Sequence, residues 1–462
     1  MIRKHPVGNY DWITIGVYLS LLIIGWLSIY SVTYSQNINR DLLDLSVPIT
    51  KQTMYVLIAL IVFLLTLWID DKFWHTFAYI IYGIGIFLLL LVLIAGTEIK
   101  GAKAWFSIGG FSFQPAEIAK FGTALALSSY LSYFKTNLKQ LNYQLISFAI
   151  ILFPVFLILL QPDAGSALTF FSFLILLYIE GLNELYYLAI ILLFAVFIFS
   201  FLIPIPFVLL GILILSIIVS WIYFRHFKYQ WILFSFCLMG LVLANVFLPV
   251  IQVVMIAGGL LFLSLIYLWK SKEERLSLML VLSSGLLILF TYTTINFFNK
   301  LEPHQQERIK VWLNPSECDP RGSLYNILQS KVAIGAGGFL GRGYLNGNMT
   351  KLKFVPEQST DFIFSSIGEE HGFIGSIIVI ILFFVLIFRI VLMSERTEKK
   401  FYSTYALCLA GLLFFHIIIN IGMTMGLLPI IGIPLPFISK GGSALIGFSL
   451  MLGVYLRMQS KS

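Results

Sequence analysis

The sequence has little charge and little cysteine, and both shortages narrow the class of protein. Charged residues make up 11% of the 462-residue chain and hydrophobic residues 59%, whereas a soluble domain carries about twice that share of charge. The three cysteines, Cys237, Cys318 and Cys408, form neither a disulfide framework nor a metal-binding motif. We therefore predict an integral membrane protein that folds without a disulfide on its outer face.

Two other signatures are missing from the chain. The net charge of +8 does not gather into a basic stripe with interleaved aromatic residues, so nucleic acid is not an expected partner. The first apolar run, near residues 11–32, is too long for a signal peptide and lacks a small-residue cleavage site. We interpret this run as the first membrane span.

What the chain has instead is a series of long apolar runs. Each is about 20 residues long, the length that crosses a bilayer as a helix, and the runs do not alternate in polarity like strands of a membrane barrel. We predict an all-α polytopic membrane protein, residues 1–462 as a single domain, with about fourteen transmembrane helices. The expected spans lie near residues 11–32, 51–69, 75–96, 116–134, 144–160, 164–180, 185–203, 207–224, 230–249, 250–269, 276–296, 366–392, 401–424 and 435–457.

The distribution of Lys and Arg predicts the orientation of these spans. With a cytoplasmic N-terminus, most Lys and Arg of the short connections fall on the cytoplasmic side, as the positive-inside rule requires. Both termini are then cytoplasmic, and a long polar segment at 297–365 lies outside with the loops at 97–115 and 425–440. A segment this long is usually a folded functional element, and we interpret its glycines between Gly335 and Gly343 as tight turns.

The end of the long segment gathers ionisable side chains beside an apolar run. They are Glu357, Asp361, Glu369 and Glu370, followed by His371. Charges so close to lipid are costly unless they are buried in protein or face water, so this cluster is a candidate functional site. From these residues alone, an equally supported alternative is that Asp361 and the preceding threonine cap a helix.

The expected helix geometry sets these acids at different depths. A helix from near Thr360 to about Leu392 would be about 50 Å long, which exceeds a hydrocarbon core of about 30 Å. Asp361 would then lie at the outer mouth of the membrane, with Glu369 and Glu370 deeper and facing the protein interior. An acid so placed suits a substrate whose head is in water and whose tail is in lipid.

Three further stretches, all mapped to the outer face, place polar residues where lipid would penalise them. In the first, Glu117 and Lys120 have the spacing of an ion pair on a helix, and Trp105 could serve simply as an interfacial anchor. In the second, Asp163 stands in a very short turn where it can cap the next helix. The third, residues 420–443, is rich in Pro and Gly, which predicts a broken or re-entrant segment.

Along most of the chain the motifs run in one order: Ala-Lys-Ala-Trp105, Phe-Gln-Pro-Ala-Glu-Ile-Ala-Lys120, Gln-Pro-Asp163-Ala-Gly, Gln329-Ser-Lys331-Val-Ala-Ile-Gly, Pro-Glu357-Gln-Ser-Thr-Asp361-Phe-Ile-Phe, Gly-Glu-Glu-His-Gly372 and Leu-Pro-Phe-Ile-Ser-Lys-Gly-Gly-Ser443. Together they resemble the SEDS family of peptidoglycan glycosyltransferases. The stretch around Asp361 is very specific, and residues 347–354 favour the RodA branch over the FtsW branch.

The chain departs from the family pattern in two places. The resemblance implies about ten spans, whereas the apolar runs of about 20 residues predict about fourteen, so about four helices are additional. We place this insertion within residues 185–275. The second departure is Lys440, which stands where the family usually has an aromatic residue.

The resemblance implies an enzyme, a hexosyltransferase that polymerises lipid II into glycan strands during cell elongation. It assigns to Asp361 the role of the base that takes a proton from the attacking sugar hydroxyl, a role that contributes about 10²–10⁴-fold in rate. The predicted substrate-binding residues are Trp105, Lys103, Lys120, Lys331, Arg342, Glu357 and Lys440, and the predicted structural polar residues are Glu117, Asp163, Glu369 and Glu370.

The resemblance also implies partners and a location. The expected partners are a class B penicillin-binding protein, which is a transpeptidase, and membrane proteins of an elongation complex. The expected location is the cytoplasmic (inner) membrane, with the active site on its outer face. No metal site is evident, and the cofactor we consider is a divalent cation, Mg²⁺ or Mn²⁺, between Asp361 or Glu357 and the pyrophosphate.

Other functions stay open at this point. A lipid II flippase would also have many spans, broken helices and acids within the membrane, although its site would lie near the midplane rather than at the outer mouth. An FtsW-like cell-division paralogue is a second possibility, and a non-enzymatic scaffold for a cell-wall complex is a third.

Overall fold

The computed structural model describes residues 10–34, 47–99, 101–108, 111–133, 136–223, 252, 255–256, 259, 262, 274–301, 303–319 and 322–461. The chain divides into two compact units. The first comprises Met1–Asn183 and Asp319–Ser462, and the second comprises Glu184–Cys318. The sequence predicts one membrane domain with inserted helices at 185–275, and that interpretation of the second unit stays a prediction.

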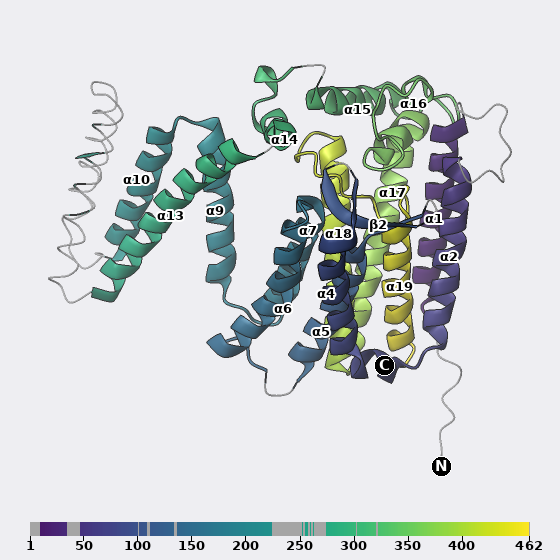
Figure 1. The fold of residues 1–462 in the computed structure, drawn as a ribbon, viewed down its shortest axis with the longest axis horizontal. Helices are drawn as coiled ribbons and strands as arrows, with labels where there is room; N and C mark the ends of the chain where they lie inside the picture. Colours follow the sequence, from purple (N-terminus) through teal and green to yellow (C-terminus); the bar gives the residue numbers. More distant parts are fainter. Residues whose placement is uncertain are drawn as a thin grey trace, which may run out of the picture. The chain divides into compact units, whose positions relative to one another are not determined.

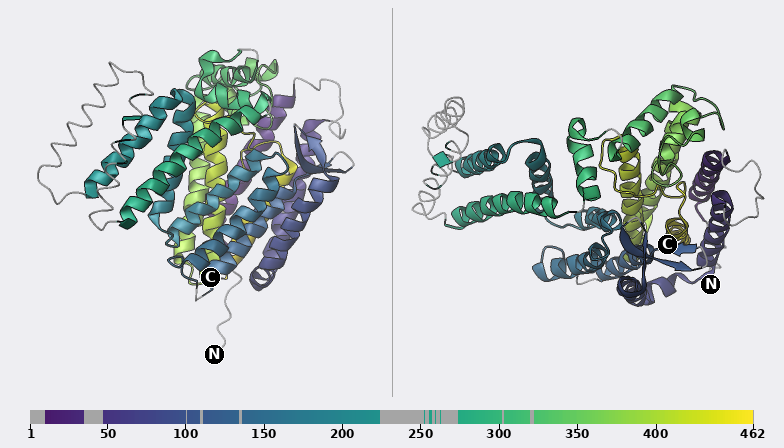
Figure 2. Two further views of the ribbon diagram at one scale, coloured as in Figure 1. Left: turned by 60° about the vertical axis from the view of Figure 1, so that its left-hand side comes forward. Right: turned by 45° about the horizontal axis from the view of Figure 1, so that its top comes forward.

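The first unit is a bundle of long helices (Figures 1 and 2). Its helices are α1 (Trp12–Tyr34), α2 (Pro48–Trp68), α3 (Asp71–Thr76), α4 (Ala78–Ala95), α5 (Pro115–Ser132), α6 (Leu141–Leu159), α7 (Ala164–Thr169), η1 (Phe170–Ser172), α8 (Phe173–Ile179), α15 (Ser323–Gly337), α16 (Asn348–Lys351), α17 (Ile363–Arg396), α18 (Lys400–Thr424) and α19 (Gly442–Gln459). Helix α2 packs on α19, α4 on α5, and α17 on both α1 and α18.

The two ends of this bundle differ in character. Helix α17 runs from the end covered by α15 and α16 to the end where α1 begins and α19 finishes (Figure 1). At the latter end Asp11 accepts two hydrogen bonds from Arg389, from Nε at 3.0 Å and from Nη2 at 2.8 Å. This bidentate ion pair ties the start of α1 to α17. The acids of the candidate site lie at the opposite end.

A small antiparallel sheet follows α4. It consists of β1 (Thr97–Ile99), β2 (Ala102–Ile108) and β3 (Phe111–Phe113), in that order. The sequence predicts an outer loop at 97–115, and these strands are an addition to that prediction. Helix α5 begins directly after β3, and its first residue is Pro115, which is favoured at this position because its missing N–H has no helical partner to lose.

The second unit contains α9 (Glu184–Leu202), α10 (Ile205–Tyr223), α13 (Glu274–Lys300), α14 (Pro303–Leu313) and η2 (Pro315–Glu317). Helices α9, α10 and α13 pack through a small apolar cluster formed by Val196, Val208, Ile212 and Leu287.

The predicted helical polytopic fold is confirmed. Among the described residues, 7 helices are long and apolar enough to cross a membrane. The expected span at 164–180 is a succession of α7, η1 and α8 rather than one helix. The expected spans at 230–249 and 250–269 lie almost entirely outside the described residues, so the total of about fourteen helices stays a prediction.

Helix α17 is broken at Gly372, where φ is 63° and ψ is −158°. An unbroken helix would place hydrogen bonds here from Phe373 to Glu369 and from Ile374 to Glu370. The break opens both bonds and leaves four backbone groups in need of partners. Unpaired backbone groups in an apolar bundle are costly, so other parts of the chain must supply those partners.

A neighbouring stretch of main chain, residues 338–343, pairs all four groups. The hydrogen bonds run from Arg342 N to Glu369 O (3.0 Å), from Gly343 N to Glu370 O (2.9 Å), from Phe373 N to Gly338 O (2.9 Å) and from Ile374 N to Phe339 O (3.2 Å). We call this contact the main-chain brace. It holds the first turns of α17, which carry Glu369 and Glu370, to the end of α15.

The brace explains some of the glycines better than turns alone do. A Cβ atom on Gly337 would collide with the carbonyl oxygen of Gly368, and one on Gly341 would collide with that of Glu370. The prediction of tight turns is wrong for Gly335 and Gly337, which belong to α15. It fits Gly341, where φ is 85°.

The brace predicts that substitutions of two glycines of α15, which lie two positions apart, have different effects on stability. Gly337→Ala should destabilise the protein by about 1–3 kcal/mol, because the added methyl group has no space. Gly335→Ala is the matched control, because nothing lies within 4 Å of its Cβ position, and it should leave stability unchanged or raise it by up to about 1 kcal/mol. Thermal unfolding in detergent measures both. Equal stability of the two variants would contradict the brace.

Candidate functional site

The segment that precedes α17 is a tight turn that presents Asp361. Glu357 has a φ of 53°, and its carbonyl oxygen accepts hydrogen bonds from the backbone N–H groups of Thr360, Asp361 and Phe362 at 3.1, 3.1 and 3.2 Å. A positive φ at a non-glycine residue is unusual and often occurs at functional sites. The N-cap residue of α17 is Phe362, so the alternative in which Thr360 and Asp361 cap this helix is wrong.

The loop between α18 and α19, residues 425–441, is attached to this turn. Ser439 Oγ donates to Thr360 O at 2.6 Å, and the backbone N–H of Lys440 donates to Ser359 O at 2.8 Å. Helix α18 ends at Thr424 and α19 begins only at Gly442. The predicted break in the helical pattern within 420–443 is therefore confirmed, and the broken segment pairs with the turn that carries Asp361.

The carboxylate of Asp361 lies against the backbone of this loop. Its Oδ2 atom is 3.4 Å from the place where a Cβ atom of Gly432 would be, and Gly432 has a φ of 79°. Glycine therefore serves two needs here, the left-handed conformation and the close approach of the acid. Asp361 itself is half-buried.

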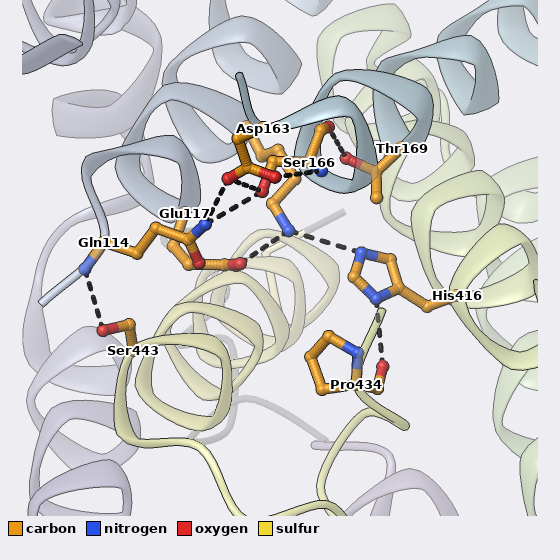
Figure 3. Close-up of polar contacts among 9 residues, drawn as sticks. Gln114, Glu117, Asp163, Ser166, Thr169, His416, Pro434 and Ser443 are labelled. Atoms are coloured by element: carbon orange, nitrogen blue, oxygen red, sulfur yellow. Dashed lines mark hydrogen bonds and ion pairs between the residues drawn. The ribbon is translucent and has the colours of Figure 1, made fainter. Parts of the chain in front are cut away.

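Below the loop a buried ion pair within α5 contacts a histidine of α18. Lys120 Nζ donates to Glu117 Oε1 at 2.8 Å and lies 3.3 Å from His416 Nε2. On its other side His416 Nδ1 lies 3.2 Å from the carbonyl oxygen of Pro434, in the loop. Figure 3 shows the two ring nitrogens of His416 contacting opposite partners, the lysine ammonium on one side and the carbonyl oxygen of Pro434 on the other. The pairing expected from the spacing of Glu117 and Lys120 is confirmed.

The burial of Lys120 bears on its predicted role as a pyrophosphate ligand. Only 1% of its side chain is exposed, and its ammonium group already contacts Glu117 and His416. In this arrangement Lys120 supports the loop from inside the protein. His416 is not among the residues predicted from the sequence, because a single histidine in an apolar run carries little signal.

A second polar cluster lies beside the first (Figure 3). Asp163 caps α7 by accepting from the Ser166 N–H at 3.0 Å, as predicted, and it accepts a further bond from Gln114 Nε2 at 2.7 Å. The backbone N–H of Gln114 in turn donates to Ser443 Oγ at 3.0 Å. The ends of β3, α7 and α19 are therefore held together around Gln114.

The remaining predicted cations and Trp105 lie in different surroundings. Lys331 projects from α15 over Gly426, because a Cβ atom there would be 2.7 Å from its Nζ, so it lies against the same loop as Asp361. Lys103 Nζ donates to Ile94 O at 3.1 Å, and Arg342 Nε donates to Ala336 O at 2.8 Å. These two groups contact the C-terminal ends of α4 and α15. Trp105 lies in β2, half-buried, where it pairs with Thr97.

The two adjacent acids of α17 have internal partners. Glu369 accepts from the backbone N–H groups of Met349 and Thr350 at 2.8 and 2.9 Å, at the start of α16, while Glu370 accepts from Ser31 Oγ. Burial, together with the nearby carboxylate of Glu370, raises the pKa of Tyr344 to about 12. Tyr344 therefore stays protonated and donates to Leu27 O at 3.1 Å.

A metal cage is not found in the part of the chain that the structure describes. Among those residues, no group of three or more His, Cys, Asp and Glu side chains is arranged to hold an ion. A divalent cation between Asp361 or Glu357 and a pyrophosphate would need ligands from the substrate. It stays a prediction.

Comparisons with known proteins agree with the motifs. The model of a cell cycle protein family that comprises FtsW, RodA and SpoVE matches residues 11–206 and 251–462. The chain is 29% identical over 463 residues to the peptidoglycan glycosyltransferase RodA of Treponema pallidum, with 100% of each chain covered. It is 29% identical over 416 residues to the peptidoglycan glycosyltransferase MrdB of Escherichia coli, covering 88% of this chain and 86% of that one.

The fold also has a solved counterpart. A chain from a peptidoglycan synthase complex that coordinates polymerization and crosslinking superposes with a TM-score of 0.62 at 22% identity, over 98% of both chains. At this identity the likeness concerns the fold.

The buried ion pair predicts a non-additive pattern of stability. Lys120→Met should destabilise the protein by about 3–5 kcal/mol, because it leaves the Glu117 carboxylate buried without its cation. The double variant Glu117→Leu/Lys120→Met removes both charges and should recover most of that loss. Lys139→Met, at an exposed position, is the control and should stay within about 0.5 kcal/mol of the wild type. Thermal unfolding in detergent decides, and purely additive losses would refute the coupling.

Proposed function

This chain belongs to the FtsW/RodA/SpoVE family of cell cycle proteins, and we propose that it is a peptidoglycan glycosyltransferase that polymerises lipid II during cell elongation. Lipid II carries a disaccharide-pentapeptide on undecaprenyl pyrophosphate. The RodA and MrdB relatives bear the name of this activity. The elongation role follows the resemblance to RodA.

The proposed reaction is a displacement at an anomeric carbon. The hydroxyl oxygen of one sugar attacks the anomeric carbon of the next and forms the new glycosidic bond. The bond from that carbon to the pyrophosphate oxygen breaks, and the lipid pyrophosphate leaves with the electron pair. Asp361 accepts the proton of the attacking hydroxyl, as a general base does.

The observation that supports this proposal is the fixed position of Asp361. Its backbone is fixed in the turn that starts at Glu357, its carbonyl oxygen accepts from Asn420 Nδ2 at 3.0 Å, and its carboxylate lies against Gly432. A fixed acid that is still partly exposed suits proton transfer to a bound substrate, because catalysis rewards groups that are positioned in advance.

Charge stabilisation of the leaving group needs a cation near this acid. Lys331 is the best supported of the predicted lysines and arginines, since it lies over Gly426 in the loop that also contacts Asp361. Its ammonium group would form charge-assisted hydrogen bonds with pyrophosphate oxygens. Lys440 and Glu357, whose backbone groups belong to the same turn and loop, complete the proposed binding region.

The proposal includes the setting of the reaction. The protein is a multi-pass membrane protein with this site at the end of the bundle opposite the Asp11–Arg389 pair. We assign that end to the outer face of the cytoplasmic membrane, with both termini inside. A class B penicillin-binding protein is the proposed transpeptidase partner, and the fold shared with one chain of a peptidoglycan synthase complex supports this proposal.

Replacement of Asp361 tests the proposed chemistry. Asp361→Asn should lower the rate of glycan-strand formation from purified lipid II by about 10²–10⁴-fold, because the amide cannot accept the proton. The full-length protein is assayed with its cognate transpeptidase, and strand length is read on gels. Glu395→Gln, an exposed change at the far end of the same helix, should behave as the wild type. Full activity of Asp361→Asn in folded protein would remove Asp361 from the chemistry.

The same preparation distinguishes the flippase alternative. Proteoliposomes that contain the wild type and labelled lipid II report movement of the lipid between leaflets. Movement without strands, unaffected by Asp361→Asn, would favour a transporter over a glycosyltransferase.

A further inference from the structure

Helix α18 holds two consecutive carbonyl groups of the loop with two side chains one turn apart. His416 Nδ1 is 3.2 Å from Pro434 O, and Asn420 Nδ2 donates to Ile433 O at 2.8 Å. The i,i+4 spacing puts both side chains on one face of the helix. Both are buried, with 1% of His416 and none of Asn420 exposed.

These two side chains connect different parts of the site. Asn420 Nδ2 also donates to Asp361 O at 3.0 Å, so it ties the loop to the turn of the proposed base. His416 reaches the other way, to the Lys120 ammonium at 3.3 Å. The chain of contacts therefore runs from Glu117 through Lys120 and His416 to the loop, and from the loop to Asp361.

The contacts determine which nitrogen of His416 carries the proton. An ammonium group can only donate, so Nε2 must accept from Lys120. The proton of the neutral ring is then on Nδ1, which points at a carbonyl oxygen and donates to it. Each nitrogen of the ring has the partner it needs, and the Lys120 ammonium group also pairs with Glu117 at 2.8 Å.

We propose that His416 is a positioning residue of the glycosyl transfer, because its Nδ1–H group fixes the loop at Pro434 and thereby fixes the backbone against which the Asp361 carboxylate rests. This inference rests on the proposed function. His416 does not touch substrate. It acts through Gly432, which precedes its carbonyl partner Pro434 by two residues. The Oδ2 atom of Asp361 lies next to Gly432.

Substitution of His416 by asparagine or by glutamine separates the roles of the two ring nitrogens. In His416→Asn the side-chain nitrogen overlies Nδ1, so the bond to Pro434 O is kept and the acceptor for Lys120 is lost. In His416→Gln the amide oxygen reaches the position of Nε2, so the acceptor is kept and the bond to the loop is lost. Misplacement of a reacting group by about 1 Å costs about 10²-fold in rate.

The first experiment measures lipid II polymerisation by full-length protein with its cognate transpeptidase. His416→Gln should lower kcat by about 10- to 100-fold with little change in KM, and His416→Asn should retain most of the wild-type kcat. The control is His75→Gln in α3, where the ring meets Phe401 edge-on at the opposite end of the bundle, and it should behave as the wild type. Thermal unfolding of each variant confirms that it is folded.

Equal losses in the two His416 variants, or wild-type kcat in His416→Gln, would overturn the positioning role. A wild type that makes no strands would instead refute the proposed function. The second readout does not depend on activity. In ¹⁵N-histidine-labelled protein, NMR should show a ring with Nδ1 protonated and Nε2 unprotonated, and this signal should vanish in His416→Asn. A His416 ring protonated on Nε2 would overturn the inference by itself.

Discussion

Backbone groups that leave a helix inside an apolar bundle need hydrogen-bond partners, and this requirement governs the end of the protein that carries Asp361. The chain leaves helical geometry there twice, at Gly372 in α17 and along 425–441 between α18 and α19. Each departure is matched by another part of the chain that arrives with the complementary donors and acceptors. The acids and cations of the site lie on or beside these non-helical stretches, so the contacts that satisfy the backbone groups also position the side chains of the site.

The two departures are satisfied in different ways. At Gly372 main chain pairs with main chain, which leaves little freedom because neither partner has side-chain rotations to adjust. Between α18 and α19 the carbonyl groups of Ile433 and Pro434 are held by side chains, those of Asn420 and His416. Side-chain donors can be exchanged or weakened one at a time. The loop is therefore the part of the site where single substitutions can alter position without destroying the fold.

The sequence predicts the features that depend on neighbours in the chain. Apolar runs of about 20 residues predict the helices, the spacing of Glu117 and Lys120 predicts their pairing, and the position of Asp163 in a very short turn before the next expected span predicts a cap. Pro and Gly density predicts that the chain is broken near residue 430. In each case the information lies within a few residues of the feature.

Features that depend on distant partners are not predicted. His416 and Lys120 are separated by 296 positions, and nothing local to either residue names the other. The strands after α4 are short, and β1 meets β2 through a register shift, so their pattern is too brief to recognise. The functional role of His416 depends on a carbonyl group, which every residue has and which leaves no mark in the sequence. Burial of Lys120 likewise requires the packed bundle.

The main-chain brace has a consequence for how this protein can vary between lineages. A contact made by peptide groups does not read side-chain identity, and Phe339 and Leu340 point outward with 65% and 76% of their surface exposed. A change at Leu340 would leave the brace intact, whereas Phe339 also stacks on Phe373. Gly337, Gly341 and Gly372 cannot accept a side chain, because a Cβ atom on any of them would strike the facing backbone. The exposed side chains beside the main-chain brace can thus differ between related proteins, while the backbone geometry beneath them stays the same.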